Sequence, residues 1–170
     1  MSARLRRDDG FGLVELLIAM TLLNVAVLAI VAAFTSGAVA LRRASETSTA
    51  SALADAQIEL YRALEYASIG VVAETTGTDG TYTGDPALSS TTNVTPGDGH
   101  CPTGATATEC RRSRTATGAD GRSYRIDTYV VADTPAGGRA LKKVTVVVRD
   151  GGNAARTLLR TSSSFDQATG

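Results

Sequence analysis

The stretch that decides the fold is FGLVELLIAMTLLNVAVLAIVAAF, residues 11–34. Its only polar side chains are those of Glu15, Thr21 and Asn24. As an α-helix that rises about 1.5 Å per residue, this stretch would extend roughly 36 Å, which is enough to cross a bilayer with some tilt. We therefore expect residues 11–41 to form a membrane-spanning helix.

Basic residues flank this span on both sides, with Arg4, Arg6 and Arg7 before it and Arg42 and Arg43 after it. The positive-inside rule then places the short N-terminal tail in the cytoplasm and the C-terminal domain outside the membrane. Arg42 and Arg43 oppose this orientation, but they lie beyond several further small residues. Removal of the span as an ordinary signal peptide is the less favoured alternative, because the apolar run is too long and only SGAVA, residues 36–40, offers a cleavage site.

The bulk composition argues against several classes of function. Among 170 residues, 17 basic and 17 acidic side chains cancel, so no strong positive field favours a nucleic-acid site. The only histidine, His100, lies in no catalytic motif, and no phosphate-binding loop or zinc-protease motif is present. We therefore expect neither an enzyme, nor a cofactor, nor a metal site.

Residues 42–69 predict the amphipathic half of the N-terminal helix, since 44–68 contain neither proline nor glycine. On a helical wheel one stripe comprises Ala50, Leu53, Gln57, Leu60, Tyr61 and Leu64. The opposite side carries Asp55, Glu59, Arg62 and Tyr66. A continuous rod and two helices hinged at Ser36-Gly37 both remain open.

Residues 70–121 are rich in Thr, Gly, Ser and Asp and predict a variable loop. Both cysteines, Cys101 and Cys110, lie in it, and an even count in an exported segment favours a disulfide between them. Such a bond would remove roughly 2.7 kcal/mol of unfolded-state entropy in the chain model. A metal site is the alternative, but with the adjacent His100 it offers three ligands at best.

Three other features of this loop are weak signals. GTDGTYTGD, residues 77–85, is faintly similar to a calcium loop through Asp79 and Asp85, but it lacks the ligand density and is better interpreted as a turn-rich linker. Asn93 begins a glycosylation triplet that chance often produces. RRSR, residues 111–114, is most simply a solvated patch.

The C-terminal third predicts a small antiparallel sheet over residues 122–165. Alternating residues at 122–131, a β-branched run at 141–150 and a third stretch at 154–165 are separated by glycine-containing turns. Three strands joined by short loops form a meander, whose apolar face needs a cover. The stripe on the 42–69 helix can supply it, so the fold class is α+β.

The stretch GFGLVELLIAM, residues 10–20, resembles the cleavage and methylation signal of type IV prepilins and type II secretion pseudopilins. In that family a basic leader ends in Gly, Phe follows, and Glu stands fifth in the mature chain. Gly10, Phe11 and Glu15 occupy these positions, and Arg4, Arg6 and Arg7 furnish the charge of a leader over residues 1–10. The resemblance implies cleavage after Gly10 and N-methylation of Phe11.

The same resemblance implies partners and a location. The partners are a prepilin peptidase/methyltransferase, other pilin or pseudopilin subunits, an inner-membrane assembly platform and the lipid bilayer. The chain would reside in the bacterial cytoplasmic membrane as a single-pass protein and then in a pilus or pseudopilus. Cleavage would create an ammonium group on Phe11, which Glu15 of the same or a neighbouring subunit could neutralise.

Three departures from the pattern of major pilins favour a minor pilin or pseudopilin. Ala32 stands where many major pilins have Pro, and Gly12 stands where Thr is commoner. The cysteine pair lies before the strands rather than around a C-terminal loop. The sequence therefore predicts a structural subunit of a type IV pilus or pseudopilus. The alternatives are a membrane-anchored binding module that uses the 70–121 loop and, with least support, an anchored enzyme.

Overall fold

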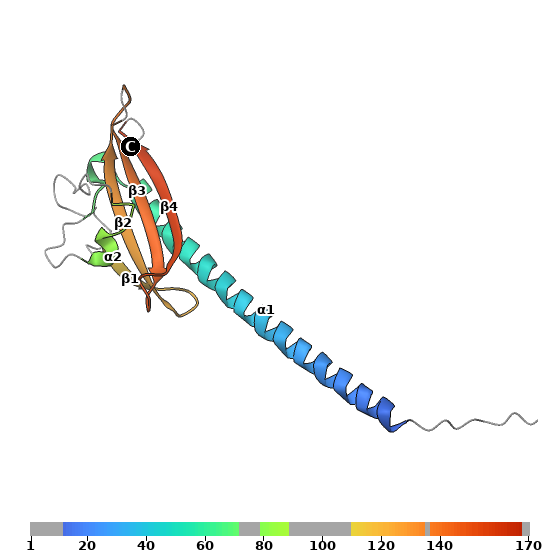
Figure 1. The fold of residues 1–170 in the computed structure, drawn as a ribbon. Coiled ribbons are helices and arrows are strands. Elements are labelled where there is room, and N and C mark those ends of the chain that lie inside the picture. The colour runs from blue at the N-terminus through green and yellow to red at the C-terminus, as the bar shows by residue number, and fades with distance from the viewer. Residues whose placement is uncertain (1–11, 72–78, 89–109, 135–136, 168–170) are drawn as a thin grey trace, which may run out of the picture. The chain divides into compact units, whose positions relative to one another are not determined.

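The computed structural model describes residues 12–71, 79–88, 110–134 and 137–167. The chain divides into two compact units between Arg43 and Ala44. In chain order the elements, labelled in Figure 1, are the helix α1 (Leu13–Arg62), the 3-10 helix η1 (Tyr66–Ser68), the short helix α2 (Gly80–Thr83), and the strands β1 (Ser113–Thr117), β2 (Ser123–Asp133), β3 (Leu141–Asp150) and β4 (Thr157–Asp166).

The first unit contains the apolar part of α1. Every large apolar side chain from Leu13 to Leu41 is exposed, so nothing else in the described chain covers this surface. The helix is long and apolar enough to cross a membrane, as residues 11–34 predict. It runs through Ser36-Gly37 as one unbroken helical element, so the secondary structure there is that of the continuous rod.

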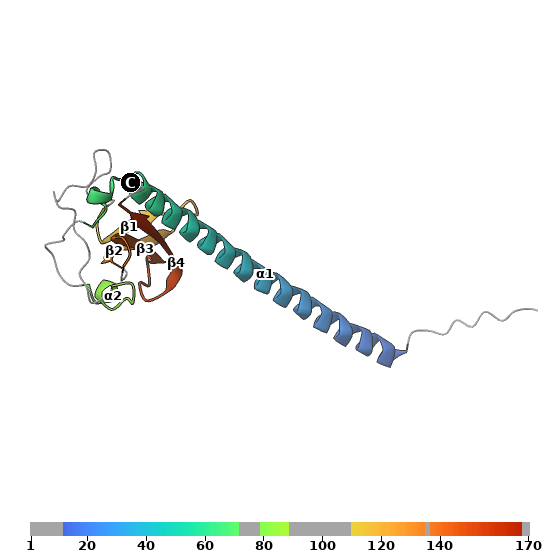
Figure 2. The ribbon, with the colours of Figure 1, turned by 90° about the horizontal axis from the view of Figure 1, so that it is seen from above.

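The second unit is built on a four-stranded antiparallel sheet in the order β1-β2-β3-β4. The register pairs Ile126 with Val148 and Val130 with Val144 across β2 and β3. These positions share one face of the sheet, and the last turns of α1 lie across that face (Figure 2). The α+β class and the cover of the sheet by the helix are thereby confirmed.

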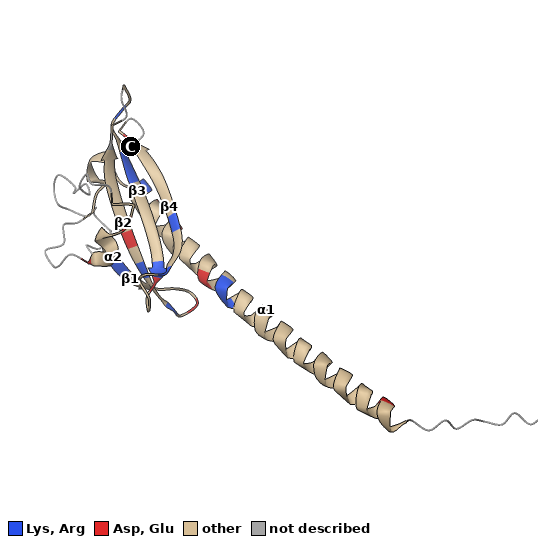
Figure 3. Cartoon of the chain, viewed as in Figure 1, with Lys and Arg blue, Asp and Glu red and all other residues tan. Residues whose placement is uncertain are grey.

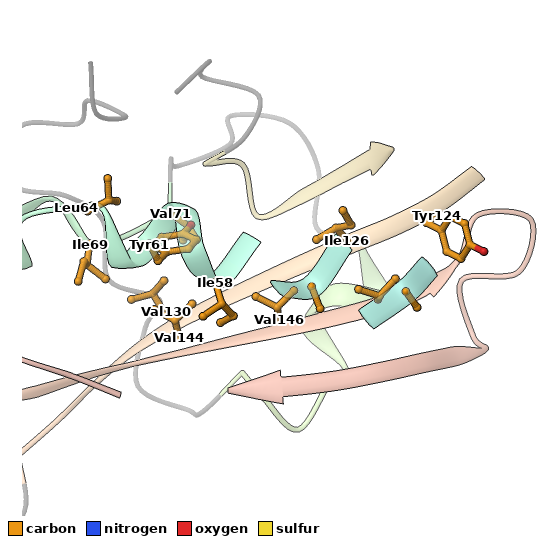
Figure 4. Packing of buried hydrophobic residues seen from close by; sticks show 13 residues of the cluster. Ile58, Tyr61, Leu64, Ile69, Val71, Tyr124, Ile126, Val130, Val144 and Val146 are labelled. Atoms are coloured by element: carbon orange, nitrogen blue, oxygen red, sulfur yellow. The ribbon is translucent and has the colours of Figure 1, made fainter. Parts of the chain in front are cut away.

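The core of the second unit forms between this face and one stripe of α1 (Figure 4). Four members of the expected stripe are buried, and Leu53 and Leu60 are partly buried at its margin. Ala54 and Ile58 are buried as well and belong to the stripe. The alanines let the helix approach the sheet, and branched strand residues fill the space beneath it; the buried set is Ala50, Ala54, Ile58, Tyr61, Leu64, Ile126, Val130, Val144, Val146 and Val148.

The expectation of three strands missed β1, which lies within the segment 70–121 that was expected to be loop. β1 pairs with β2 from Ser113↔Asp127 to Thr117↔Ser123. A tight turn joins them: the N–H of Gly118 donates to the carbonyl of Arg122 at 2.8 Å, and Gly121 adopts a positive φ of 75°. The alternation of β1 was too short to stand out, because only five residues carry it.

A second apolar cluster covers the other face of the sheet, where α2 and the following turns lie. Tyr82 stacks on Tyr129 with ring centroids 4.3 Å apart, and both pack with Val147. The hydroxyl of Tyr82 donates to the carbonyl of Thr128 at 2.7 Å. The described residues 79–88 are therefore a packed layer rather than a free linker.

Buried ion pairs fasten this layer to the sheet. Asp127, fully buried on β2, accepts hydrogen bonds from Arg125 at 2.8 Å and from Arg149 at 2.9 Å. Arg149 also pairs with Asp85, whose carboxylate accepts two further bonds from Arg160, both at 2.8 Å. Two arginines bind the carboxylate of Asp85, which argues against a role of Asp85 as a calcium ligand.

Removal of one partner of this network should be costly. We expect Asp127→Ala to lower the free energy of unfolding by about 3–5 kcal/mol, because Arg125 and Arg149 would stay buried after losing the carboxylate that they share. Glu59→Ala is the matched control: its pair with Arg62 is exposed, and its loss should change the stability by less than about 1 kcal/mol. Urea unfolding of the full chain in detergent measures both, and equal effects would contradict the assignment.

The network also sets a dependence on pH. Burial alone would raise the pKa of Asp85, but the hydrogen bonds from Arg160 and from the backbone N–H of Ala87 outweigh it and lower the pKa below its ordinary value of 3.8. A lowered folded-state pKa stabilises the fold at pH values above the unfolded-state pKa, and this contribution is lost as the pH falls through the lowered value. We expect the urea concentration at the unfolding midpoint to decrease as the pH is lowered below about 4. In Asp85→Asn this decrease should be smaller. An unchanged slope in the variant would contradict this role of Asp85.

Candidate processing and assembly site

The candidate site lies where α1 begins. The carbonyl of Gly12 accepts hydrogen bonds from the backbone N–H groups of Glu15 at 2.9 Å and of Leu16 at 3.2 Å. Gly12 therefore stands at the position that precedes the first helical residue, Leu13. The helix starts at the third residue of the predicted mature chain, just past Phe11.

Glu15 is the acidic residue of the first turn of α1. Its negative charge there complements the positive end of the helix dipole and the backbone N–H groups that have no partner within the helix. The neighbouring side chains of Leu13, Val14 and Leu16 are all apolar and exposed. The helix end therefore tolerates this acid better than any later position in the apolar stretch would.

The carboxylate of Glu15 forms no ion pair or side-chain hydrogen bond within the described ranges, whose first residue is Gly12. Figure 3 shows one acidic position at this end of α1, followed by an uncharged stretch of helix. In the sequence the next charged residues after Glu15 are Arg42 and Arg43. At about 1.5 Å per residue, Arg42 is roughly 40 Å away along the helix axis. In a bilayer the helix itself therefore supplies no cation for Glu15.

The other predicted residues of the signal lie outside the described part of the chain. These are Arg4, Arg6, Arg7, Gly10 and Phe11. Cleavage after Gly10, methylation of Phe11 and the charge of the leader accordingly stay predictions. Glu15 is the one member of the signal whose position the structure describes.

The predicted disulfide is half described. Cys110 is buried at the start of the segment that leads into β1, and no described cysteine is a free thiol. Cys101, His100 and Asn93 lie outside the described residues, as do 72–78 and 89–109 of the variable loop. The pairing of Cys101 with Cys110 stays a prediction.

A buried acid in the second unit was missed from the sequence. Glu46 on α1 accepts hydrogen bonds from Arg122 and, at 2.9 Å, from Arg156. Burial alone would raise the pKa of Glu46, but these two arginines outweigh that effect and lower it. Glu46 lies four residues before Ala50 and so continues the buried stripe, which is the signal that could have identified it.

Beside this cluster is a cavity of about 200 Å³ that Glu46, Arg122, Tyr124 and Asp150 help to line. Both carboxylates are paired with arginines, Glu46 as above and Asp150 with Arg156 at 3.2 Å. In the described residues no group of three or more His, Cys, Asp or Glu side chains could hold a metal ion. The charged side chains that line this cavity are thus paired, as in a cluster of structural ion pairs.

A second missed contact closes the C-terminal end of the helical segment. Lys142 on β3 donates from its Nζ to the carbonyls of Tyr66 at 2.6 Å and of Ile69 at 2.8 Å, and it lies over the Tyr66 ring. Burial lowers the pKa of Lys142. The amine thus satisfies backbone acceptors that follow the helix, a role that no local sequence pattern indicates.

Comparison with known proteins identifies the N-terminal segment and nothing beyond it. No curated protein and no solved structure matches the chain. Residues 5–38 match the family model of the prokaryotic N-terminal methylation motif, which includes Gly10, Phe11 and Glu15. The N-terminal segment of this chain therefore carries a prokaryotic N-terminal methylation motif, consistent with a type IV prepilin-like signal.

Proposed function

We propose that this chain is a minor pilin or pseudopilin: it is cleaved after Gly10, N-methylated on Phe11 and assembled into a type IV pilus or a type II secretion-like pseudopilus. The observation that carries the proposal is the position of Glu15. It is an acid in the first turn of an exposed apolar helix, without a described partner, four residues after the predicted new N-terminus.

Cleavage would supply a cation, which Glu15 lacks among the described residues. An α-amino group has a reference pKa of about 7.7–8.0 and is largely protonated near neutrality. The amine of Phe11 would lie about one turn from Glu15 on the same chain, or next to Glu15 of a neighbouring subunit. An unpaired charge is costly in hydrocarbon, so the pairing favours a subunit that enters the assembly in the correct register.

The exposed surface of α1 supplies the driving force for assembly. Once a subunit leaves the bilayer, its side chains from Leu13 to Phe34 must be buried again. Burial of a large aliphatic side chain contributes about 1.5–3 kcal/mol, and this helix carries many of them. The described surface of the second unit exposes no large apolar side chain, so helix packing is the apolar contact available.

The same proposal sets the topology. The leader would stay in the cytoplasm, where a prepilin peptidase/methyltransferase acts, and the second unit would lie outside the membrane. An inner-membrane assembly platform would then transfer the subunit from the bilayer to the filament. The structural role, rather than an enzymatic one, is the role of proteins that carry the matched signal.

Processing is testable directly. In a host with an active prepilin peptidase, mass spectrometry of the membrane-extracted chain should show Phe11 at the N-terminus with one added methyl group. We expect Gly10→Val to accumulate as the precursor, because a side chain next to the cut bond obstructs the peptidase. An N-terminus at Met1 or Ser2 in the unchanged chain would overturn the proposal.

The role of the charge needs a separate test. We expect Glu15→Ala to be cleaved normally and to reach filaments at least about ten-fold less than the unchanged chain, because loss of one buried ion pair corresponds to more than about 1.4 kcal/mol. Glu15→Gln keeps the size and removes the charge, so it should behave like Glu15→Ala. The control is Asp55→Ala, which removes an exposed acid of the second unit and should leave incorporation unchanged. Immunoblots of sheared filaments give the ratio, and normal incorporation of Glu15→Gln would refute the electrostatic role.

A further inference from the structure

Asn24 is the second polar side chain of the apolar stretch that the helix leaves without a partner. Its side chain is exposed and forms no hydrogen bond within the part of the chain that the structure describes. Thr21 differs, because its hydroxyl donates to the carbonyl of Ile18 at 2.8 Å. Thr35 likewise donates to Val31 at 2.9 Å. Only Glu15 and Asn24 therefore carry polar groups in this stretch that require something outside their own helix.

Glu15 and Asn24 cannot share one neighbour side by side. Nine residues at about 100° each place them on opposite faces of α1, and about 13 Å apart along its axis. Asn24 instead shares its face with Leu17 and Val31, seven residues before and after it, and with Leu28. A neighbouring helix that contacts the face of α1 with Glu15 therefore leaves the face with Asn24 uncovered.

The chemistry of the amide favours one occupant for that face, a second copy of the same chain. A primary amide has two donors and an acceptor, and each would be unsatisfied against a purely aliphatic helix or lipid. Two copies inserted with the same topology have the same span, so their Asn24 side chains lie at the same depth. Each amide then meets a group that can both donate to it and accept from it.

We propose that Asn24 pairs two copies of this chain within the membrane, through mutual amide hydrogen bonds along the face of Leu17, Asn24 and Val31. A single asparagine at a seven-residue repeat of apolar residues is known to set helix register and partner number. Interhelical hydrogen bonds of this kind stabilise association in bilayers. The pairing rests on the membrane insertion that the proposed function requires, but not on cleavage.

The arrangement separates two contacts on one helix. The Asn24 face holds the membrane-resident pair, while the Glu15 face stays open for the amine of a further subunit. Loss of Asn24 should therefore affect association of the precursor in the membrane, whereas loss of Glu15 should not.

The test uses the full chain with two different C-terminal tags, coexpressed in a bacterial host without prepilin peptidase. Membranes are solubilised in mild detergent, one tag is captured, and the amount of the other tag is measured. We expect the unchanged chains to co-purify and Asn24→Leu to reduce the yield by about five-fold or more. Asn24→Gln, which retains the amide, should keep most of the yield.

Two controls make the result specific. Thr21→Val removes a hydroxyl that the helix satisfies itself, so its yield should stay within about two-fold of the unchanged chain. Carbonate extraction checks that Asn24→Leu still inserts in the membrane, as its greater apolarity requires. Failure of the unchanged chains to co-purify, or full co-purification of Asn24→Leu, would overturn the pairing.

The outcome is independent of cleavage and of filament assembly. Because the host lacks the peptidase, a positive result needs neither the new N-terminus nor a filament. Conversely, an uncleaved N-terminus in a host with the peptidase would overturn the pilin proposal and leave the co-purification result standing.

Discussion

The rest of the structure depends on one constraint: α1 has to bury two surfaces of different kinds. From Leu13 to Leu41 its apolar residues are exposed on all sides, whereas from Glu46 onward only one stripe is buried. A sheet can cover a stripe, but a surface that surrounds a helix needs lipid or several other helices. The second unit therefore completes its own core, and the first unit depends on surroundings that the described part of the chain does not supply.

The polar groups of the two units follow the same division. In the second unit each described acid that is buried has arginines of the same chain beside it, as Asp127 has Arg125 and Arg149. Buried pairs of this kind contribute little net stability compared with apolar packing, but they penalise any arrangement that separates them. They thus fix how the layer around α2 lies on the sheet. In the first unit Glu15 and Asn24 have no such partners among the described residues, so they depend on groups outside the described helix.

Local sequence patterns predicted those elements whose hydrophobic periodicity extends over many residues. The apolar run, the helix that continues from it, its buried stripe and the long strands β2, β3 and β4 each carry a periodicity that a sequence displays. β1 was missed because five residues give too short an alternation, and because its Thr-rich sequence resembles the loop around it. The ion network was missed for another reason: Asp85, Asp127 and Arg160 are far apart in sequence. The register of the sheet and the packing of the layer around α2 bring them together. Of the candidate site, Glu15 could be identified because its spacing from Gly10 and Phe11 is part of a local motif, which residues 5–38 match, and does not depend on the fold of the second unit.

The two buried or membrane-facing acids on α1 show how one chemical group serves two purposes. Glu46 finds Arg122 and Arg156 in its own chain, and the contact holds the helix on the sheet. Glu15 lies on the same helix, but the described residues around it include no cation, so its cost in hydrocarbon is removed when a positive charge outside them comes close. A charge that is paired within its own chain, such as that of Glu46, stabilises the fold. A charge without such a partner, such as that of Glu15, favours any later step that brings an opposite charge next to it. The proposed proteolysis after Gly10 would be such an event, because it would replace the peptide bond before Phe11 with an ammonium group close to the start of the helix.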